Sequence, residues 1–358
     1  MSQYLSDKLR LLSFVSIVLV LYIHSTFHYT DAEVGGMLLN YYLQEPISSM
    51  LGRLAVPMFF AMSGFLFFRG TEENEKKVFQ KQRRRIKTLL IPYLLAASFM
   101  PIVFLLLKLT GLLDFLVSKS FYYLSEPWWK ILFRVFLYNV PDEGPFAFHL
   151  WFLRDLIIVV CFTPLLWRLK RLKFGIEAFM AILLVLLLFD VQPAKAFFWF
   201  CLGAQFFQKQ SPTTLAFVGL LFYVVVSLFQ IVFSNEAWKY FEIPMTAIGV
   251  LSVWYSYDKL MPQTFSLISH KWLDLLCQST FFIYLYHIPL KVFVSKSMML
   301  ALHPSSSAYA FCYLFSPWIT IACLVMIALL LHKFFPRFYS VLVGGRVFRS
   351  TLISPNTP

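Results

Sequence analysis

The stretch DKLRLLSFVSIVLVLYIHSTFHYTDAE, residues 7–33, decides how the rest of the chain is interpreted. Two basic residues, Lys8 and Arg10, precede an apolar run over residues 11–23 that leads directly to His24. A helix that starts with this run has climbed roughly 20 Å at His24, about two-thirds of a hydrocarbon core of roughly 30 Å. An imidazole at that depth is costly, so it indicates either a functional group or a packing histidine that bonds a neighbouring helix.

The composition of the whole chain excludes a soluble domain. Of its 358 residues, 59% are hydrophobic and only 14% are charged, and the mean hydropathy is +0.70. Soluble domains carry charges on about a quarter of their residues. Apolar runs recur along the chain without strand-like alternation, which favours helices. The sequence therefore predicts an all-α, multi-pass protein of the inner (plasma) membrane.

About ten transmembrane helices are expected, and they belong to one membrane domain over residues 1–340, followed by a basic cytoplasmic tail over 341–358. There is no internal repeat that would indicate two halves. The expected spans are 11–29, 50–68, 88–108, 149–167, 174–189, 196–207, 214–233, 244–257, 273–293 and 310–331.

The net charge is +13, and the basic residues lie in loops between apolar runs, as expected for a membrane topology signal. The loop Arg69–Lys87 alone holds eight lysines and arginines, and the positive-inside rule then predicts that both termini are cytoplasmic. This cluster abuts a span and has no folded domain around it, which argues against nucleic acid as a partner. The five cysteines are odd in number and lack zinc-type spacing, so neither a metal site nor a disulfide framework is predicted.

In this orientation, polar residues on different helices fall at one level in the outer half of the membrane. Basic residues at the start of the 88–108 span face the cytoplasm instead. The sequence thus suggests a protein that binds an anion inside and does chemistry further out. The outer residues are His24, Arg53, His149, Trp151 and His287, and the inner ones are Arg83, Arg84, Arg85 and Lys87.

Five motifs occur in a particular order over most of the chain. They are VSIVLVLYIHS (15–25), RLAVPMFFAMSGFLFF (53–68), RRRIKTLLIPYLL (83–95), HLWFL (149–153) and FFIYLYHIPL (281–290). Each motif is weakly specific alone. With all five motifs in this order, the chain resembles the acyltransferase 3 superfamily of integral membrane acyltransferases. The resemblance implies about ten spans and transfer of an acyl group, usually acetyl from cytoplasmic acetyl-CoA, to a hydroxyl of an extracytoplasmic or lipid-linked glycan.

The resemblance also implies roles for individual residues. The catalytic histidine of the family falls on His24, and its basic R-x-x-R-type pair falls on Arg84 and Lys87, with Arg83 and Arg85 alongside. Other motif positions fall on Arg53 with Ser63 and Gly64, on Trp151 and on His287. It implies no metal.

One motif position departs from the family. Many members place an arginine eleven residues before the first-helix histidine, where this chain has Ser13. Arg10 lies three residues earlier on a neighbouring face, and its long side chain is expected to contact the cofactor instead. His28 shares a helix face with His24, so it orients His24, contacts the acceptor or lies in the membrane interface.

The chemistry needs few groups, because a thioester is already activated. Transfer to an alcohol requires a base for the hydroxyl and donors for the oxyanion. His24 fits either as general base or as a transient acyl acceptor. Arg53 or Trp151 could donate to the oxyanion, or anchor the membrane interface. His287 lies just before Pro289, which is expected to break its helix and free carbonyl groups.

Several alternatives stay open. The basic residues before the 88–108 span either hold the phosphates of CoA or serve as a topology signal that binds anionic lipid. A multi-pass transporter or flippase for a glycan or lipid-linked intermediate is the alternative function, although no half-to-half symmetry supports it. The acceptor, the acyl chain length, the oligomeric state and the role of residues 111–146 are left open.

Overall fold

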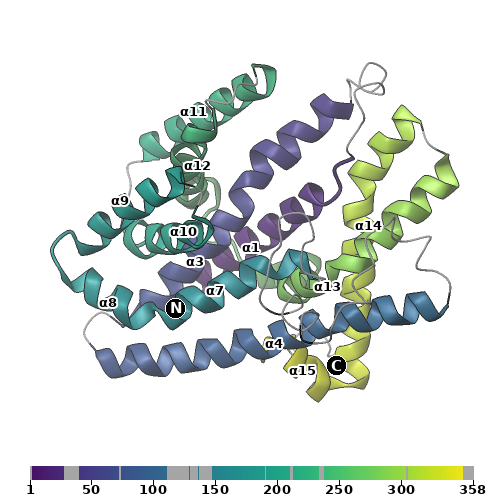
Figure 1. The fold of residues 1–358 in the computed structure, drawn as a ribbon, viewed down its shortest axis with the longest axis horizontal. Helices are drawn as coiled ribbons and strands as arrows, with labels where there is room; N and C mark the ends of the chain where they lie inside the picture. Colours follow the sequence, from purple (N-terminus) through teal and green to yellow (C-terminus); the bar gives the residue numbers. More distant parts are fainter. Residues whose placement is uncertain are drawn as a thin grey trace. The chain divides into compact units, whose positions relative to one another are not determined.

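The computed structural model describes residues 2–27, 40–71, 74–110, 129, 136, 147–189, 191–209, 213–233, 238–303 and 305–349. Within these ranges every regular element is helical, as predicted (Figure 1). His28 and all of 111–146 except Trp129 and Phe136 lie outside them. The elements are α1 (Gln3–Ile23), η1 (Glu45–Leu51), η2 (Gly52–Leu54), α3 (Ala55–Phe68), α4 (Glu75–Leu109), η4 (Phe148–Leu150), α7 (Trp151–Cys161), α8 (Thr163–Arg171), α9 (Gly175–Leu188), α10 (Gln192–Phe206), α11 (Thr213–Val232), α12 (Trp238–Leu260), η5 (Leu267–Ser269), α13 (Lys271–Leu302), α14 (Ser306–Phe334) and α15 (Pro336–Leu342).

The chain divides into two compact units. The first consists of Met1–Arg83 and Val159–Thr280, and the second of Arg84–Ile158 and Phe281–Pro358. The first unit thus contains α1, α3 and α8 to α12, whereas the second contains α14, α15 and most of α4, α7 and α13. A single membrane domain over residues 1–340 stays a prediction.

Helix α1 has a capped start and internally satisfied hydroxyl groups. The hydroxyl of Ser2 accepts a hydrogen bond from the backbone N–H of Leu5 at 3.3 Å. Ser13 and Ser25 each donate to a carbonyl oxygen one turn earlier, at 2.7 Å. Such bonds let serine lie in an apolar helix without an unsatisfied hydroxyl. The helix ends at Ile23, which leaves His24 at its C-terminal cap.

In the first unit, α3 and α10 pack closely against each other (Figure 1). A Cβ atom added to Gly64 would lie 1.9 Å from the carbonyl oxygen of Phe200. One added to Gly203 would lie 1.8 Å from the carbonyl oxygen of Ala61. Both distances are far below van der Waals contact, so glycine is required at both positions. Small residues commonly permit such approaches between membrane helices.

The irregular segment η1 packs against both α1 and α11. It is a π-helical stretch, and such stretches often occur at functional sites. The hydroxyl of Ser48 donates to the carbonyl oxygen of Tyr22 at 3.0 Å, and that of Tyr223 donates to the carbonyl oxygen of Met50 at 2.7 Å. The C-terminal end of α1 is therefore held against η1.

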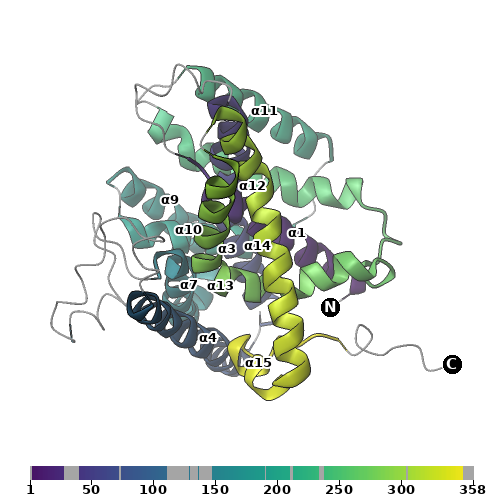
Figure 2. The same cartoon turned by 90° about the vertical axis from the view of Figure 1, so that its right-hand side faces the viewer.

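In the second unit, α13 is interrupted as the sequence predicts. Ile288 has non-helical angles (φ −96°, ψ 131°) directly before Pro289. Proline lacks an N–H group and clashes with the preceding turn, which explains the interruption. Further along, α15 folds against the end of α14 (Figure 2). There Tyr339 is buried and stacks on Phe348, with ring centroids 5.4 Å apart.

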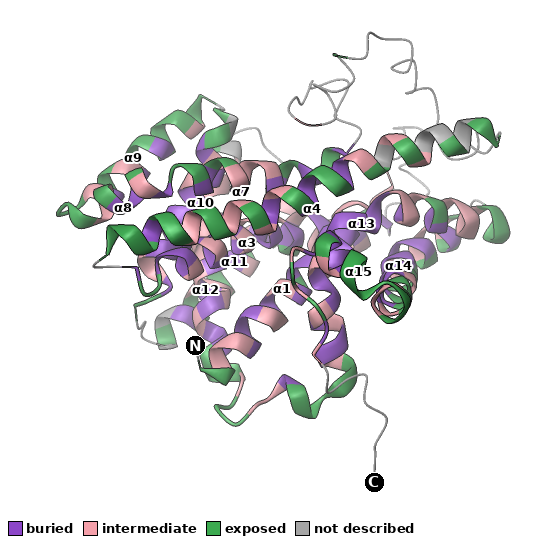
Figure 3. Ribbon diagram, turned by 90° about the horizontal axis from the view of Figure 1, so that it is seen from below, coloured by how far each residue is buried: buried purple, intermediate pink, exposed green. Residues whose placement is uncertain are grey.

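Three helical segments in the described part of the chain are long and apolar enough to cross a membrane. They are Asn40–Phe68, Glu75–Val103 and Ser306–Phe334. The second has little of its apolar length buried, and α4 shows many exposed residues in Figure 3. Together with the composition these segments support a membrane protein, while ten spans and cytoplasmic termini stay predictions.

The expected continuous span over 149–167 is divided. The helical stretches Phe148–Cys161 and Thr163–Arg171 meet at a bend of 56°, and they count as a fourth candidate span only if taken together. Pro164 lies in the first turn of α8. Because proline lacks an N–H group, it suits a helix start but cannot continue the preceding helix.

Candidate functional site

His24 is the C-terminal cap residue of α1. Its backbone N–H donates to the carbonyl oxygen of Val20 at 3.1 Å, and its side chain is partly exposed. The segment after it is fixed by the backbone N–H of Phe27, which donates to the side-chain oxygen of Gln44 at 2.9 Å. The structure therefore places His24 just beyond the end of α1, whereas the sequence predicted a span that continues to residue 29.

A cavity of about 180 Å³ lies beside η1 and is called the Arg53 pocket here. Arg53 donates to the side-chain oxygen of Gln230 at 3.1 Å, and Glu45, Ser227 and Trp238 also line the pocket. Its wall thus combines an aromatic ring with cationic, acidic, amide and hydroxyl groups. Since η1 also packs against α1, the pocket and the C-terminal end of α1 share one supporting element.

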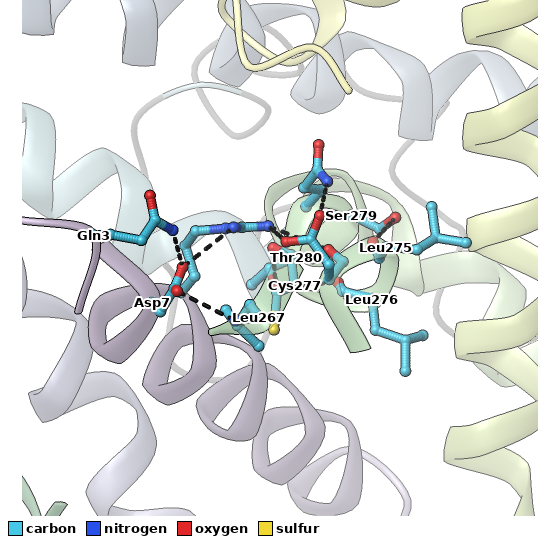
Figure 4. Close-up of polar contacts among 11 residues, drawn as sticks. Gln3, Asp7, Leu267, Leu275, Leu276, Cys277, Ser279 and Thr280 are labelled. Atoms are coloured by element: carbon cyan, nitrogen blue, oxygen red, sulfur yellow. Dashed lines mark hydrogen bonds and ion pairs between the residues drawn. The ribbon is translucent and has the colours of Figure 1, made fainter. Parts of the chain in front are cut away.

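Arg10 is held by two carboxylates at the end of α1 opposite to His24, and one of them, Asp7, is labelled in Figure 4. Its guanidinium pairs with Asp274 of α13 and lies 3.6 Å from Asp7, one turn earlier. Asp7 is fully buried and also accepts hydrogen bonds from the side chain of Gln3 at 2.8 Å and the backbone of Leu267 at 3.2 Å. These contacts give Arg10 a structural role, while its contact with a cofactor stays a prediction.

The second unit brings two histidines together. His287 is fully buried, and its Nδ1 lies 2.9 Å from the carbonyl oxygen of Tyr284 and 3.3 Å from that of Ile283. The Nε2 of His149 lies 3.2 Å from the carbonyl oxygen of Leu285, and the two imidazole centroids are 4.9 Å apart. The carbonyl groups of the turn before the proline break therefore bind both rings, as expected for freed backbone groups.

Tyr284 contacts the segment that carries His149, and the sequence analysis did not identify it as a site residue. Its hydroxyl donates to the carbonyl oxygen of His149 and accepts the backbone N–H of Leu153, each at 3.2 Å. Its spacing of three residues before His287 was a usable signal, because such residues share a helix face. Unlike the buried side chains of His149 and His287, the side chain of Trp151 is 36% exposed.

The predicted basic cluster lies along α4. The side chains of Arg83, Arg84 and Lys87 are exposed, and that of Arg85 is half-buried. Arg346, which the sequence did not point to, donates to the carbonyl oxygen of Thr88 at 3.1 Å and lies 4.1 Å above the ring of Phe281. Burial and the neighbouring charge of Arg85 lower the pKa of Arg346 to about 10. A basic residue from the tail therefore joins the α4 cluster.

The predicted site residues are divided between the two units. His24 and Arg53 belong to the first, and His149, Trp151 and His287 to the second. Their common level in the membrane stays a prediction. Among the described residues, no three histidine, cysteine, aspartate or glutamate side chains are grouped as a metal site would require. All five cysteines are free.

Comparison with known proteins identifies the family. The model of the acyltransferase 3 family, described as an acyltransferase domain, matches residues 7–332. No curated protein and no solved structure gives a match. The matched range covers most of the chain and includes every site residue predicted from the sequence, from Arg10 to His287. The chain therefore belongs to the acyltransferase 3 family, and this membership supports an acyltransferase activity at a membrane.

Proposed function

We propose that this protein is a membrane O-acyltransferase, with acetyl-CoA as donor and a hydroxyl of an extracytoplasmic or lipid-linked glycan as acceptor. His24 is the proposed general base or acyl acceptor. The observation that carries the proposal is the position of His24 at the end of α1, next to the element that lines the Arg53 pocket. The end of α1 that carries His24 and the wall of the polar cavity thus contact the same segment, η1.

In the proposed reaction the imidazole of His24 first accepts a proton and later donates it. The imidazole of His24 accepts the hydroxyl proton as the acceptor oxygen attacks the thioester carbonyl carbon. The tetrahedral intermediate then collapses, the C–S bond breaks, and the CoA thiolate takes the proton from the imidazolium. In the covalent version the imidazole nitrogen attacks the thioester carbonyl carbon and the C–S bond breaks, which releases the CoA thiolate; the acceptor oxygen then attacks the acyl-imidazole, the C–N bond breaks, and the hydroxyl proton passes to the released imidazole.

The Arg53 pocket suits a hydroxylated acceptor. Carboxylate, amide and guanidinium groups offer acceptors and paired donors to neighbouring hydroxyls, and Glu45, Gln230 and Arg53 supply one of each. The ring of Trp238 offers an apolar face for the C–H surface of a sugar. Arg53 is also the proposed donor to the oxyanion, because its Nη1 already points into this polar network at Gln230.

The remaining site proposals concern the donor and the second unit. Arginine forms paired hydrogen bonds to phosphate, so the basic cluster on α4 is proposed to contact the phosphates of CoA. His287 and Trp151 stay proposed catalytic contacts. The residues of the α4 cluster are Arg83, Arg84, Arg85 and Lys87, and Arg10 on α1 is a separate proposed contact of the donor.

The experiment gives acetyl-CoA with a labelled acetyl group to purified protein in neutral detergent and follows thiol release and transfer to lipid-linked glycan. We expect His24→Ala to lower both rates by roughly 10²–10⁴-fold, the usual contribution of a general base. The matched control is His270→Ala, because His270 is exposed and lies outside the proposed site. Equal rates in His24→Ala and the wild type would remove His24 from the mechanism. Glycan movement across vesicles without label transfer would favour a flippase.

A further inference from the structure

One segment of the chain contacts both the end of α1 and the Arg53 pocket. This segment covers residues 41–53 and includes η1. Two sets of residues recur in it at intervals of four, which places each set on one side of a helix. The set that contacts α1, called the α1 face here, is Gln44, Ser48 and Gly52. The set that lines the pocket, called the pocket face, is Tyr41, Glu45, Ser49 and Arg53.

The α1 face holds the chain on both sides of His24. The hydroxyl of Ser48 donates to the carbonyl oxygen of Tyr22 at 3.0 Å, two residues before the histidine. The backbone N–H of Phe27, three residues after it, donates to the side-chain oxygen of Gln44 at 2.9 Å. Ser48 and Gln44 are both buried, so the two bonds are shielded from solvent. The backbone that carries the imidazole is therefore attached to this segment at two points.

Gly52 makes the closest contact of the α1 face. A Cβ atom added to it would lie 2.7 Å from Cγ1 and 3.0 Å from Cδ1 of Ile23. Both distances are shorter than the roughly 3.5–4.0 Å at which carbon atoms attract each other best. Ile23 directly precedes His24, and Gly52 directly precedes Arg53. The absence of a side chain at Gly52 therefore lets the residue next to Arg53 pack against the residue next to His24.

The π-helical geometry of η1 keeps the two faces aligned. In an α-helix with 3.6 residues per turn, residues four apart are rotated by about 40° from one another, so that a row of them drifts around the helix. A π-helix has wider turns, which oppose this drift. Here the backbone N–H of Gly52 donates to the carbonyl oxygen of Ile47, five residues earlier, as is typical of a π-helix. Three successive members of the α1 face can therefore contact the same end of α1.

The pocket face is anchored independently to α11. The hydroxyl of Tyr223, which is buried, donates to the carbonyl oxygen of Met50 at 2.7 Å. Arg53 donates to the side chain of Gln230 at 3.1 Å. Neither bond involves α1. A change in the contact between α1 and its face of the segment therefore displaces the end of α1, while the pocket keeps its own support.

We propose that Gln44, Ser48 and Gly52 are positioning residues, which hold His24 where an acceptor hydroxyl in the Arg53 pocket meets its imidazole. The inference rests on the proposed function, because it takes His24 as the base or acyl acceptor and the pocket as the acceptor site. Proximity and orientation contribute strongly to catalysis, and a misplacement of about 1 Å lowers a rate by roughly 100-fold. The α1 face acts on this orientation and does not itself touch the reacting atoms.

The test is Gly52→Ala in the transfer assay, with lipid-linked glycan extracted from the source membranes as the varied acceptor. The new methyl group lies roughly 1 Å closer to Ile23 than ordinary carbon contact allows, so the end of α1 is expected to shift. We expect kcat to fall about 10- to 100-fold, while the acceptor KM changes less than about twofold because the pocket stays in place. Ile23→Ala/Gly52→Ala removes the atoms that the methyl group meets and should restore most of kcat.

Ser48→Ala is a second variant, which adds no atoms to the contact. The carbonyl oxygen of Tyr22 keeps its bond from the backbone N–H of Ser25 at 3.0 Å, so little stability should be lost. We expect kcat to fall several-fold at an unchanged acceptor KM, because one of the attachments next to His24 is gone.

A matched control and the melting temperatures separate positioning from loss of the fold. The control is Gly219→Ala, whose Cβ also meets a side chain, that of Ser252, but outside the α1 face and the pocket. Its kcat and KM should stay within about twofold of the wild type. A loss of activity in Gly52→Ala that follows a lower melting temperature, and that Ile23→Ala does not repair, overturns the inference because the fold then accounts for it. A raised acceptor KM at unchanged kcat overturns it as well, because the pocket has then moved.

The outcomes also separate this inference from the proposed function. Wild-type kcat in Gly52→Ala or Ser48→Ala, together with an inactive His24→Ala, overturns the inference and leaves the function intact. Full transfer in His24→Ala overturns the inference and removes His24 from the mechanism. A wild type without acyl transfer overturns both the inference and the proposed function.

Discussion

The contacts of Arg10 allow a prediction that separates a structural role from a donor-binding role. The side chains of Asp7 and Asp274 are 0% and 3% exposed, and Arg10 between them is 17% exposed. Arg10→Gln therefore leaves two nearly buried carboxylates without their cation. Asp274→Asn leaves Arg10 with Asp7 as a counter-charge. We expect the first substitution to destabilise the protein more than the second.

The magnitudes follow from the burial. Removing one partner of a buried ion pair costs about 3–5 kcal/mol, and this is expected for Arg10→Gln. Losing a single hydrogen bond to a charged group costs about 1.5–3 kcal/mol, and this is expected for Asp274→Asn. At about 2 °C per kcal/mol for a large domain, the melting temperature falls by about 6–10 °C and about 3–6 °C, respectively. The double variant should lose about 1.5–3 kcal/mol less than the sum of the two.

The assay is thermal unfolding of purified protein in one detergent, with and without CoA. The matched control is Arg168→Gln, because Arg168 pairs with Glu75 at 3.1 Å while both side chains are exposed. An exposed pair contributes about 0–1 kcal/mol, so the control should shift by no more than about 2 °C. Because Arg10 is also a proposed contact of the donor, the stabilisation by CoA should be smaller in Arg10→Gln than in Arg168→Gln.

Two results would refute this reasoning. A melting temperature of Arg10→Gln equal to that of the wild type would show that the ion pairs do not support the fold. Strict additivity in the double variant would show that Arg10 and Asp274 do not interact. CoA stabilisation of Arg10→Gln equal to that of Arg168→Gln would leave Arg10 with the structural role alone.

Two further predictions concern packing and the histidine pair. Gly203→Ala should lower the free energy of unfolding by about 1–3 kcal/mol or more, because the added Cβ meets a backbone oxygen that cannot move freely. Gly219→Ala is the control and should cost less, because its Cβ meets a serine side chain. The melting temperatures of the two variants are compared. Tyr284→Phe should cost about 1–3 kcal/mol, because it removes the acceptor of the Leu153 N–H and the donor to the carbonyl of His149. Slower hydrogen–deuterium exchange at Leu153 in Tyr284→Phe than in the wild type would contradict this last account.

Some local features could be predicted from residues close in the sequence. The break of α13 follows from Pro289, because the missing N–H and the ring of proline act on the turn directly before it. The end of α1 was not predicted, because the expected span continued to residue 29, whereas the helix ends at Ile23. The bend between α7 and α8 was missed, although Pro164 was visible, because the apolar pattern continues through it.

Contacts between distant segments could not be predicted in the same way. Arg10 and Asp274 are 264 residues apart, and His149 and the carbonyl group it contacts are 136 residues apart. A cavity around Lys8 also collects residues from four helices, and the sequence suggested only a topology signal for that lysine.

The sequence by itself therefore determined that the chain is helical, apolar and a member of its family. Only the tertiary structure decided which polar residues meet, as in the Arg53 pocket, the histidine pair and the cavity at Lys8. The reason is physical. In a membrane helix the faces toward lipid and toward protein are both apolar, so the pattern reports depth but neither rotation nor neighbours.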